Sequence, residues 1–382
     1  MKRILIVLPS CRTGGVLSSL IALLNSSLVE RYSVSLFIMN TYSEKLSPEL
    51  GKYSIGKNWG TSLLVANIMH CAGIRKIILI IFKLLIKLPW FGPYVAHIIE
   101  RVTINVIERR KYDSIISFQE SLSLPFVAKF SNPNKVAWIH CDYSRIYTTD
   151  DYEYSIFSRY SKIVTVSEYT KNTFCTLLPS LKTKVFSVYN VMDTESIIRK
   201  SKEPILDVNF KSDVFTIISV GRVSSVKQFH VIPDIAADLK SRGVIFRWYI
   251  LGDIVEMEAY RKLKCSIESN LVQDSVIYLG NKSNPYPYFD AADLLVSTSS
   301  SEACPMIFNE AKILNLPVVT NSFGSALEFI RDGQDGRVCP ISEMSGVIET
   351  IIRGDHIYHP CIFDSFNDNV IQRKIDSVLT FN

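Results

Sequence analysis

Hydrophobic residues occur in short continuous runs that alternate with segments of helical periodicity. The run Ile4–Leu8 is followed by residues 16–28, whose apolar positions recur at helical spacing. Short apolar runs between helices predict strands that are buried on both faces, and therefore an α/β fold with parallel sheets. The strands expected in the first half of the chain are residues 4–8, 33–39, 114–118, 136–140, 162–167 and 184–190.

The same pattern restarts after a polar interruption. From Asp193 to Asp213 the sequence is polar and charged, contains Pro204 and lacks a sustained apolar period, which predicts a linker. Residues 229–243 and 306–314 have helical periodicity. The strands expected in the second half are residues 214–221, 246–253, 275–280, 293–299, 317–321 and 337–340.

Two consecutive doubly wound domains are therefore expected, with a cleft between them. We expect a first Rossmann-like domain over residues 1–195, a linker over 196–213 and a second Rossmann-like domain over 214–362. Residues 363–382 form a tail, for which a return to the first domain is one option. In open α/β sheets, ligands bind beyond the carboxyl ends of the strands, so the candidate site residues are sought there.

Composition narrows the functional classes. The chain has 382 residues and a net charge of +5, but no dense Lys/Arg block, so nucleic acid is not an expected partner. Its eight cysteines lie far apart without a C-x-x-C pair, which indicates reduced thiols rather than a zinc knuckle or a disulfide scaffold. The run Ile4–Leu8 is too short for a signal peptide, and no apolar stretch is long enough to span a membrane. We expect a cytoplasmic protein.

Two glutamates lie close to the start of one predicted helix. Glu302 follows the strand 293–299 in a serine-rich turn, and Glu310 lies about two turns into the helix that begins after Pro305. Asn315 tolerates the left-handed conformation that ends such a helix. The N–H groups at a helix start attract phosphate, and two carboxylates beside them would accept hydrogen bonds from sugar or ribose hydroxyls.

These glutamates resemble the E-x7-E signature of the retaining nucleotide-sugar glycosyltransferases of family 4, which have the two-domain GT-B fold. Other segments resemble motifs of that family in order and spacing, so that the resemblance covers nearly the whole chain. They are VGRVSSVKQF (220–229), VTVSEYTKNTF (164–174), VYNVMDTESI (188–197) and LEFIRDGQDGRV (327–338).

The resemblance implies an activity. The protein would be a retaining, metal-independent hexosyltransferase with no cofactor beyond its UDP- or GDP-linked sugar donor. The first domain would bind a glycan or polyprenyl-linked acceptor, and the second would bind the donor. The biological setting would be the synthesis of a bacterial surface polysaccharide.

Roles follow residue by residue. Arg222 and Lys227 match the basic pair that holds the donor diphosphate, where fixed cations stabilise the charge that builds on the leaving group. Glu310 matches the carboxylate that accepts hydrogen bonds from the ribose, and Glu302 matches the one that contacts the donor sugar. His140 matches a first-domain histidine that faces the donor sugar.

Backbone positions are also implied. Gly14, Gly15 and Gly221 match glycines in loops of the family that bring the main chain close to the donor or acceptor. Cys304, Pro305 and Met306 match the residues of the family at the start of this helix, whose backbone approaches the sugar and phosphate. The family often has glycine and an aromatic residue directly after the first glutamate, where this chain has Ala303 and Cys304. The identity of the donor sugar therefore stays open.

Each of these residues also has a plain structural interpretation. The charged residues Glu302, Glu310, Arg222 and Lys227 could lie on the surface without a ligand, and His140 could be a histidine satisfied at a strand end. The glycine pair Gly14–Gly15 could form a simple turn.

Two further patterns are better explained by local structure than by a ligand-binding or metal site. Ser325 and Glu328 have the spacing of a capping box. The pair His356 and His359 lacks a third ligand, and no D-x-D occurs in the chain, so we expect no catalytic metal.

Rival functions remain at this point. A nucleotide-sugar epimerase or phosphorylase would share the fold, and so would a non-catalytic scaffold that binds sugar nucleotides. An intact set of Glu302, Arg222, Lys227 and Glu310 disfavours the scaffold. A dinucleotide oxidoreductase is disfavoured because neither glycine loop reads G-x-G-x-x-G.

Residues 75–95 form an amphipathic segment inside the first domain. Read as a helix, it places Lys76, Lys83 and Lys87 on one narrow arc, and most of the remaining surface is apolar. The helical part is about 21 Å long, too short to cross a bilayer of ~30 Å, and aromatic residues follow it. One interpretation is peripheral contact with the cytoplasmic face of the membrane, and the other is a core helix with a solvated lysine stripe.

Overall fold

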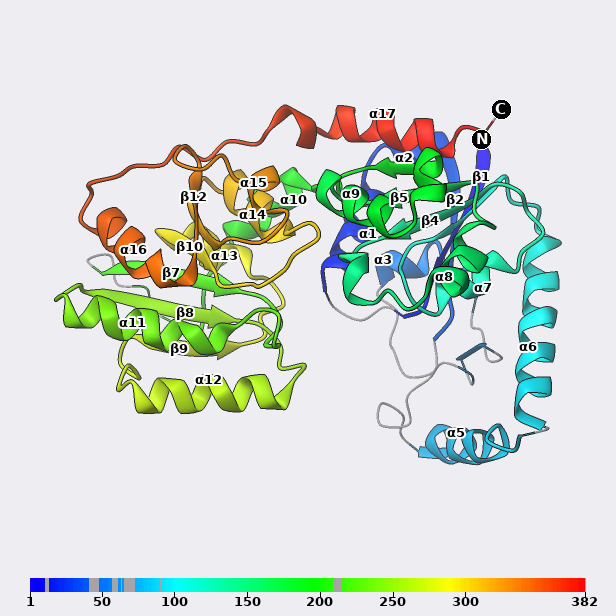
Figure 1. Cartoon of the computed structure of the whole chain (residues 1–382), viewed down its shortest axis with the longest axis horizontal. Helices are drawn as coiled ribbons and strands as arrows, with labels where there is room; N and C mark the ends of the chain where they lie inside the picture. The colour runs from blue at the N-terminus through cyan, green and yellow to red at the C-terminus, as the bar shows by residue number, and fades with distance from the viewer. Residues whose placement is uncertain are drawn as a thin grey trace. The chain divides into compact units, whose positions relative to one another are not determined.

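The computed structural model describes residues 1–10, 14–40, 48–56, 61–62, 64, 73–89, 91–208, 210 and 214–381. The chain divides into two compact units. Unit 1 comprises Met1–Val191 together with Asp368–Asn382, and unit 2 comprises Met192–Asn367. Within each unit, the described strands form a parallel sheet that carries helices on its faces (Figure 1).

In unit 1, the described strands form a six-stranded parallel sheet in the order β2-β1-β3-β4-β5-β6. β1 lies between β2 and β3, where Leu5 is in register with Ser35 and Ile115. The strands are β1 (Lys2–Leu8), β2 (Tyr32–Ile38), β3 (Ser114–Ser117), β4 (Lys135–Ile139), β5 (Lys162–Thr165) and β6 (Val185–Ser187). The helices are α1 (Gly15–Asn25), α2 (Leu28–Arg31), α3 (Pro48–Gly51), α5 (Gly73–Leu85), α6 (Phe91–Glu108), α7 (Ser123–Ala128), α8 (Asp150–Phe157), α9 (Glu168–Leu177) and α17 (Asp368–Leu379), with 3-10 turns η2 (Tyr143–Arg145) and η3 (Pro179–Lys184).

In unit 2, the described strands form a second six-stranded parallel sheet, in the order β12-β11-β10-β7-β8-β9. Trp248 lies in its core together with Ile235 of α11 and Ile348 of α16. The strands are β7 (Phe215–Val220), β8 (Phe246–Leu251), β9 (Val276–Gly280), β10 (Leu294–Ser297), β11 (Val318–Asn321) and β12 (Gly336–Cys339). The helices are α10 (Thr194–Ser201), α11 (Ile232–Ser241), α12 (Met257–Ser269), α13 (Tyr286–Asp290), α14 (Met306–Ile313), α15 (Ala326–Phe329) and α16 (Met344–Ile352), with 3-10 turns η4 (Phe229–Val231), η5 (Ile341–Glu343) and η6 (Asp364–Phe366).

The expected α/β architecture is confirmed, and every predicted apolar run overlaps an observed strand. The run Ile4–Leu8 shows why, since each of its side chains is at most 1% exposed. Helices on both sides of a parallel sheet bury both faces of its central strands, so the sequence there is continuously apolar rather than alternating.

The polar segment after Val191 differs from the expected linker. Residues 194–201 form the helix α10, and the chain from Met192 onward packs as part of unit 2. The side chain of Asp193 caps the helix by accepting from the Ser196 N–H at 3.0 Å. Ile197 is buried with Met306 of α14. With so few buried side chains in eight residues, the helix has too little apolar periodicity to be found in the sequence.

The last helix of the chain packs on unit 1. Arg31 pairs with Asp376 of α17, and the hydroxyl of Tyr32 donates to the same carboxylate at 3.0 Å. The amine of Lys162 donates to two carbonyl oxygens at the end of the helix, those of Ser377 and Thr380, each at 2.8 Å. Burial and the Asp376 carboxylate raise the pKa of Tyr32 to about 12. Unit 1 is therefore built from both ends of the chain.

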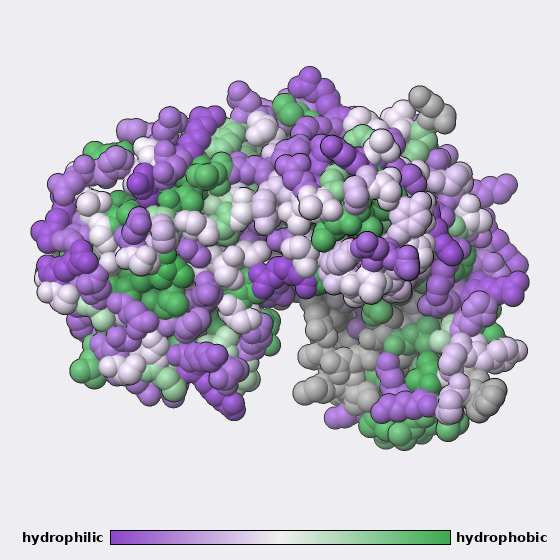
Figure 2. Space-filling model, viewed as in Figure 1, coloured by the Kyte–Doolittle hydropathy of each residue, from purple (hydrophilic) through white to green (hydrophobic). Residues whose placement is uncertain are grey.

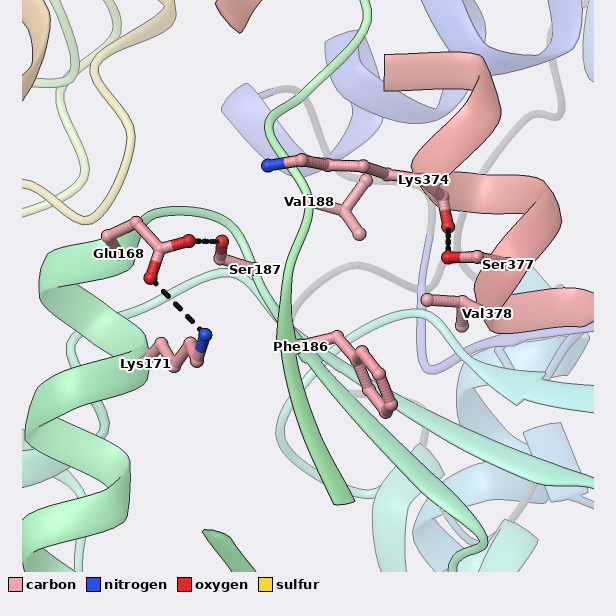
Figure 3. Close-up of a pocket in the computed structure, with 8 residues that line it drawn as sticks. All are labelled: Glu168, Lys171, Phe186, Ser187, Val188, Lys374, Ser377 and Val378. Atoms are coloured by element: carbon pink, nitrogen blue, oxygen red, sulfur yellow. Dashed lines mark hydrogen bonds and ion pairs between the residues drawn. The ribbon is translucent and has the colours of Figure 1, made fainter. Parts of the chain in front are cut away.

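A cavity of about 200 Å³ lies between α9, β6 and α17 (Figure 3). Glu168 accepts from the Ser187 hydroxyl and pairs with Lys171 at 3.4 Å, so the cavity wall carries charges of both signs. The lining residues are Glu168, Lys171, Phe186, Ser187, Val188, Lys374, Ser377 and Val378. None of the site residues predicted from the sequence lines this cavity.

The predicted amphipathic segment forms two helices that meet at a tight corner. The N–H of Gly92 donates to the carbonyl of Leu88 at 2.9 Å, which joins the start of α6 to the end of the preceding turn. A Cβ atom at Gly92 would lie 1.7 Å from the carbonyl oxygen of Ile86, so this corner requires glycine.

Candidate functional site

Glu302 is fixed in the loop that joins β10 to α14. Its Oε1 atom accepts from the hydroxyl of Ser299 at 2.7 Å and lies 2.5 Å from the amine of Lys227. Its carbonyl oxygen accepts from the hydroxyl of Ser325 at 2.7 Å. The side chains of Glu302 and Lys227 are each 18% exposed. The carboxylate is therefore held in one orientation while an edge stays open to solvent.

The predicted capping box at Ser325 is wrong. The Ser325 side chain makes no capping hydrogen bond to α15, because its hydroxyl is directed at the Glu302 carbonyl instead. Ser325 thus supports the loop that carries Glu302, a role that only the tertiary structure reveals.

Lys227 is positioned by the loop that follows β7. The hydroxyl of Thr298 donates to the Lys227 carbonyl at 2.7 Å, and the Ser300 N–H donates to the Val226 carbonyl at 2.8 Å. The Lys227 side chain lies along Gly221, where a Cβ atom would come within 2.8 Å of its Cε atom. Two loops at the carboxyl ends of neighbouring strands β7 and β10 are thereby joined at one cation.

Arg222 lies beside this cluster in sequence but is exposed. Within the described part of the chain, its guanidinium makes no ion pair. The two members of the predicted basic pair therefore differ: Lys227 is held by a carboxylate, whereas Arg222 is free to extend toward a ligand.

Glu310 lies in α14, and its side chain is buried. The hydroxyl of Tyr286 donates to its Oε1 atom at 3.3 Å. Burial raises the pKa of Glu310 to about 7, an effect that the Tyr286 hydrogen bond and the charge of Lys227 partly offset. Lys227 therefore acts on both glutamates, and the structure brings Glu302, Glu310, Lys227 and Gly221 together at one end of the sheet of unit 2.

Tyr286 was missed by the sequence analysis. It begins α13, in a segment that contains two tyrosines, and burial raises the pKa of its hydroxyl. Nothing in the local pattern distinguishes the tyrosine that reaches Glu310 from Tyr288, whose hydroxyl donates to Asp207. The contact depends on how α13 packs relative to α14.

The start of α14 contains the three backbone positions implied by the resemblance. Pro305 is the N-cap residue and Met306 the first helical residue, as the sequence predicted. Cys304 and Met306 pack in a small apolar cluster with Met192. The helix ends before Asn315, whose φ of 59° confirms the predicted left-handed residue.

The remaining predicted residues belong to unit 1. Gly14 is the N-cap residue of α1, and Gly15 begins that helix. His140 follows β4, with its ring 4.6 Å from the ring of Phe118 and stacked near Trp138. Neither ring nitrogen has a hydrogen-bond partner among the described residues, and burial lowers the pKa of His140 to about 3. The imidazole is therefore neutral near pH 7, and both ring nitrogens are buried.

Glu120 was also missed. Its Oε2 atom accepts from the backbone N–H of His140 at 2.6 Å, and it accepts a further hydrogen bond from the Cys141 side chain. Burial raises the pKa of Glu120. This carboxylate fixes the main chain at the end of β4 and so positions His140.

No group of three or more His, Cys, Asp or Glu side chains suited to hold a metal ion occurs among the described residues. The positive charge of the cluster is that of Lys227, and the exposed Arg222 follows Gly221 in the same loop. The arrangement can neutralise an anionic group such as a diphosphate and offer two carboxylates to neutral hydroxyls.

Comparison with known proteins indicates the class. Residues 202–355 match the family model of glycosyl transferases group 1, which spans most of unit 2 and the whole cluster. The chain is 26% identical over 263 residues to the uncharacterized glycosyltransferase MJ1059 of Methanocaldococcus jannaschii, covering 63% of each protein. It is 27% identical over 140 residues to the lipopolysaccharide core biosynthesis glycosyltransferase LpsE of Rhizobium meliloti, covering 37% of this chain and 39% of LpsE. The match spans less than two thirds of the length of either relative.

The fold is shared with solved glycosyltransferase structures. Anabaena HepE in complex with UDP-glucose is similar with a TM-score of 0.69 at 17% identity, over 99% of each chain. The two parallel sheets and this likeness establish the GT-B fold, with two Rossmann-like domains. The group 1 match and the fold together support a glycosyltransferase.

Proposed function

We propose that the protein is a retaining glycosyltransferase that moves a sugar from a UDP- or GDP-linked donor to a glycan or lipid-linked acceptor in bacterial surface polysaccharide synthesis. The observation that carries this proposal is the cluster in which Lys227 pairs with Glu302 and acts on the buried Glu310, inside the segment that matches the group 1 model. The names of LpsE and of the HepE–UDP-glucose complex support the setting and the donor class.

In the proposed complex, Lys227 and Arg222 bind the donor diphosphate. As the bond from the anomeric carbon to the diphosphate oxygen breaks, negative charge grows on the leaving group, and fixed cations stabilise it without a metal ion. Arg222 adds a planar fork that can bind two phosphate oxygens, whereas Lys227 acts as a point charge.

The two glutamates would bind opposite ends of the donor. Glu310 accepts hydrogen bonds from the ribose hydroxyls, and Glu302 accepts from the sugar hydroxyls. The backbone around Cys304 and Met306 approaches the sugar and phosphate at the start of α14. His140, which is neutral, is proposed to face the donor sugar as a hydrogen-bonding group rather than as a cation.

Retention of configuration would result from substitution on one face of the sugar. The acceptor oxygen forms its bond to the anomeric carbon on the face from which the diphosphate leaves, and the acceptor proton passes to the departing diphosphate oxygen. No covalent enzyme intermediate is required. NMR of the product gives the anomeric configuration, and an inverted product contradicts this part of the proposal.

A thermal-shift panel of UDP-, GDP- and ADP-sugars tests donor binding, with UDP-glucose first. A ligand at about 100 times its Kd stabilises the folded state by about 2.7 kcal/mol, which is enough to read. The panel should be repeated with EDTA, which should leave the shift unchanged. Incubation of the bound donor without an acceptor then distinguishes transfer from epimerisation, because an epimerase changes the sugar with no acceptor present.

We also propose that the protein works at the cytoplasmic face of the membrane, where a polyprenyl-linked acceptor would be found. Among the described residues, no helix is both long and apolar enough to cross a bilayer.

A further inference from the structure

An unusual apolar face covers one side of α5. Five large aliphatic side chains on this helix and the turn after it are more than half exposed, and a sixth is 44% exposed. Figure 2 shows the hydrophobic colour gathered over this helix. The α5 face comprises Ile74, Ile77, Ile81, Leu84, Leu85 and Leu88.

The exposure follows from how α5 packs. Leu79 is fully buried, and Phe82 and Ile86 are half-buried, so these three form the side that contacts the rest of unit 1. At 100° per residue, the α5 face spans roughly 100° on the other side of the helix. In the part of the chain that the structure describes, only one side of α5 is covered, so the core-helix interpretation does not account for this face.

The lysines of α5 and of the turn after it point in different directions. Lys76 and Lys87 are exposed at the edge of the α5 face. Lys83 turns inward, where its amine donates to the carbonyl of Leu64 at 2.7 Å and burial lowers its pKa. The predicted stripe of three solvated lysines is thus a pair. Within the described residues, neither Lys76 nor Lys87 has a carboxylate partner.

The sequence that flanks α5 carries charges of one sign. Between residues 51 and 99 the sequence contains no aspartate or glutamate, although the whole chain has 37 acidic residues. The lysine and arginine residues of this stretch are Lys52, Lys57, Arg75, Lys76, Lys83 and Lys87. A second copy of the chain on the same face would set lysines against lysines, which is repulsive, whereas an anionic surface is complementary to them.

The helix is suited to lie on a bilayer rather than to cross it. Its 13 residues extend about 20 Å, less than the ~30 Å hydrocarbon core. Aliphatic side chains on one face with lysines at its edge are typical of interfacial helices, whose lysine stems lie along the apolar region while their amines reach phosphate groups. Tyr94, two-thirds exposed at the start of α6, is suited to the headgroup level.

We propose that the α5 face docks the protein on an anionic lipid bilayer, with α5 in the plane of the surface. The aliphatic side chains enter the boundary between headgroups and acyl chains, and Lys76 and Lys87 contact lipid phosphates. This inference deepens the proposed location at the membrane, but it does not depend on the proposed sugar transfer, because docking of this kind needs neither donor nor acceptor.

Flotation of the full chain with lipid vesicles tests the proposal. Wild type should float with vesicles of phosphatidylglycerol and phosphatidylethanolamine and stay at the bottom with phosphatidylcholine alone. Lys76→Glu/Lys87→Glu should reduce binding to the anionic vesicles at least about tenfold, since each lysine near anionic lipid contributes to binding. Ile77→Ser/Leu84→Ser/Leu88→Ser should do the same through the apolar contribution.

Matched controls carry the same changes elsewhere. Lys200→Glu/Lys262→Glu alters the net charge equally, and Leu206→Ser/Ile245→Ser/Ile357→Ser removes exposed aliphatic side chains from unit 2. Both should float like wild type. All variants should keep the wild-type melting temperature and donor-induced thermal shift, which separates docking from donor binding.

Two outcomes overturn the proposal. One is equal flotation of wild type and the Lys76→Glu/Lys87→Glu variant. The other is wild type that stays at the bottom with anionic vesicles; if it also dimerises in analytical ultracentrifugation and the serine variant does not, the α5 face is an interface between copies.

Discussion

The amine of Lys227 lies 2.5 Å from the Oε1 atom of Glu302, and this ion pair joins the loop after β7 to the loop after β10. The cation is therefore already oriented, and partly neutralised, before a ligand binds. A diphosphate that bound Lys227 would have to compete with Glu302 for the amine. In return, a hydroxyl that donates to Glu302 meets a carboxylate already fixed by Lys227 and Ser299.

We expect Lys227→Ala to lower turnover about a hundredfold or more, because removing one electrostatic group that stabilises a transition state has an effect of this size. Arg222→Ala should have a similar effect, and Arg222→Lys should restore only part of the rate, because a point charge cannot replace the planar fork. Initial rates of donor consumption with acceptor measure this. Lys262→Ala is the control. Wild-type rates in both Lys227→Ala and Arg222→Ala would show that neither residue binds the donor diphosphate.

Substitutions of Glu310 and Glu302 should have different effects on nucleotide affinity, which titration calorimetry measures. Glu310→Gln should weaken binding of UDP or GDP alone, since it removes the charged acceptor for the ribose. Glu302→Gln should leave nucleotide affinity unchanged or tighter, because Lys227 loses its competing partner, and should depress sugar transfer. The reverse order of nucleotide affinities would mean that the two ends of the donor are assigned the wrong way round.

Stability should depend on pH through Glu310. Burial raises its pKa from 4.5 to about 7, so between these values the folded protein binds more protons here than the unfolded chain does. The free energy of unfolding therefore falls as pH rises from about 4.5 to about 7, by ~3 kcal/mol from this group. Glu310→Gln should stabilise the ligand-free protein at about pH 8 and have little effect at about pH 4.5. Urea denaturation at the two pH values measures this, and an equal effect at both contradicts it.

The hydrogen bond from Tyr286 should lower the pKa of the Glu310 carboxyl group. If ribose hydroxyls donate to ionised Glu310, UDP-glucose affinity should rise about tenfold between about pH 6 and pH 8, following a pKa of about 7. Tyr286→Phe removes a hydrogen bond to the charged form, so the midpoint should move to higher pH by about one unit. Titration calorimetry across this range measures the midpoint. An unchanged midpoint in the phenylalanine variant would limit Tyr286 to a packing role.

Much of the fold could be predicted from the sequence because a parallel sheet buries both faces of its strands. The runs at Ile4–Leu8 and Leu294–Ser297 are recognisable without any knowledge of their neighbours. The helix α10 was missed, because its stability depends on the packing of Ile197 against Met306, which is distant in the sequence.

Some residues of the candidate site could be predicted from the sequence, and others depend on tertiary packing. Glu302 and Glu310 could be selected from their places after a predicted strand and in the helix that follows it, and Lys227 from the resemblance to the family motif. The structure brings the three together, while their roles toward a donor stay predictions. Tyr286 and Glu120 could not be selected, because their partners Glu310 and His140 lie on other elements and only packing defines those pairs.

The packing of α17 on unit 1 has a consequence for biosynthesis. The residues that receive this helix, among them Arg31 and Lys162, are translated long before Asp376. At about 5 to 20 residues per second, roughly 10 to 40 s separate Val191 from the end of α17, and all of unit 2 emerges in that interval. Unit 2 can therefore fold first although it is encoded second, and a nascent chain cut short at Asn367 would release a complete unit 2 attached to an unfinished unit 1.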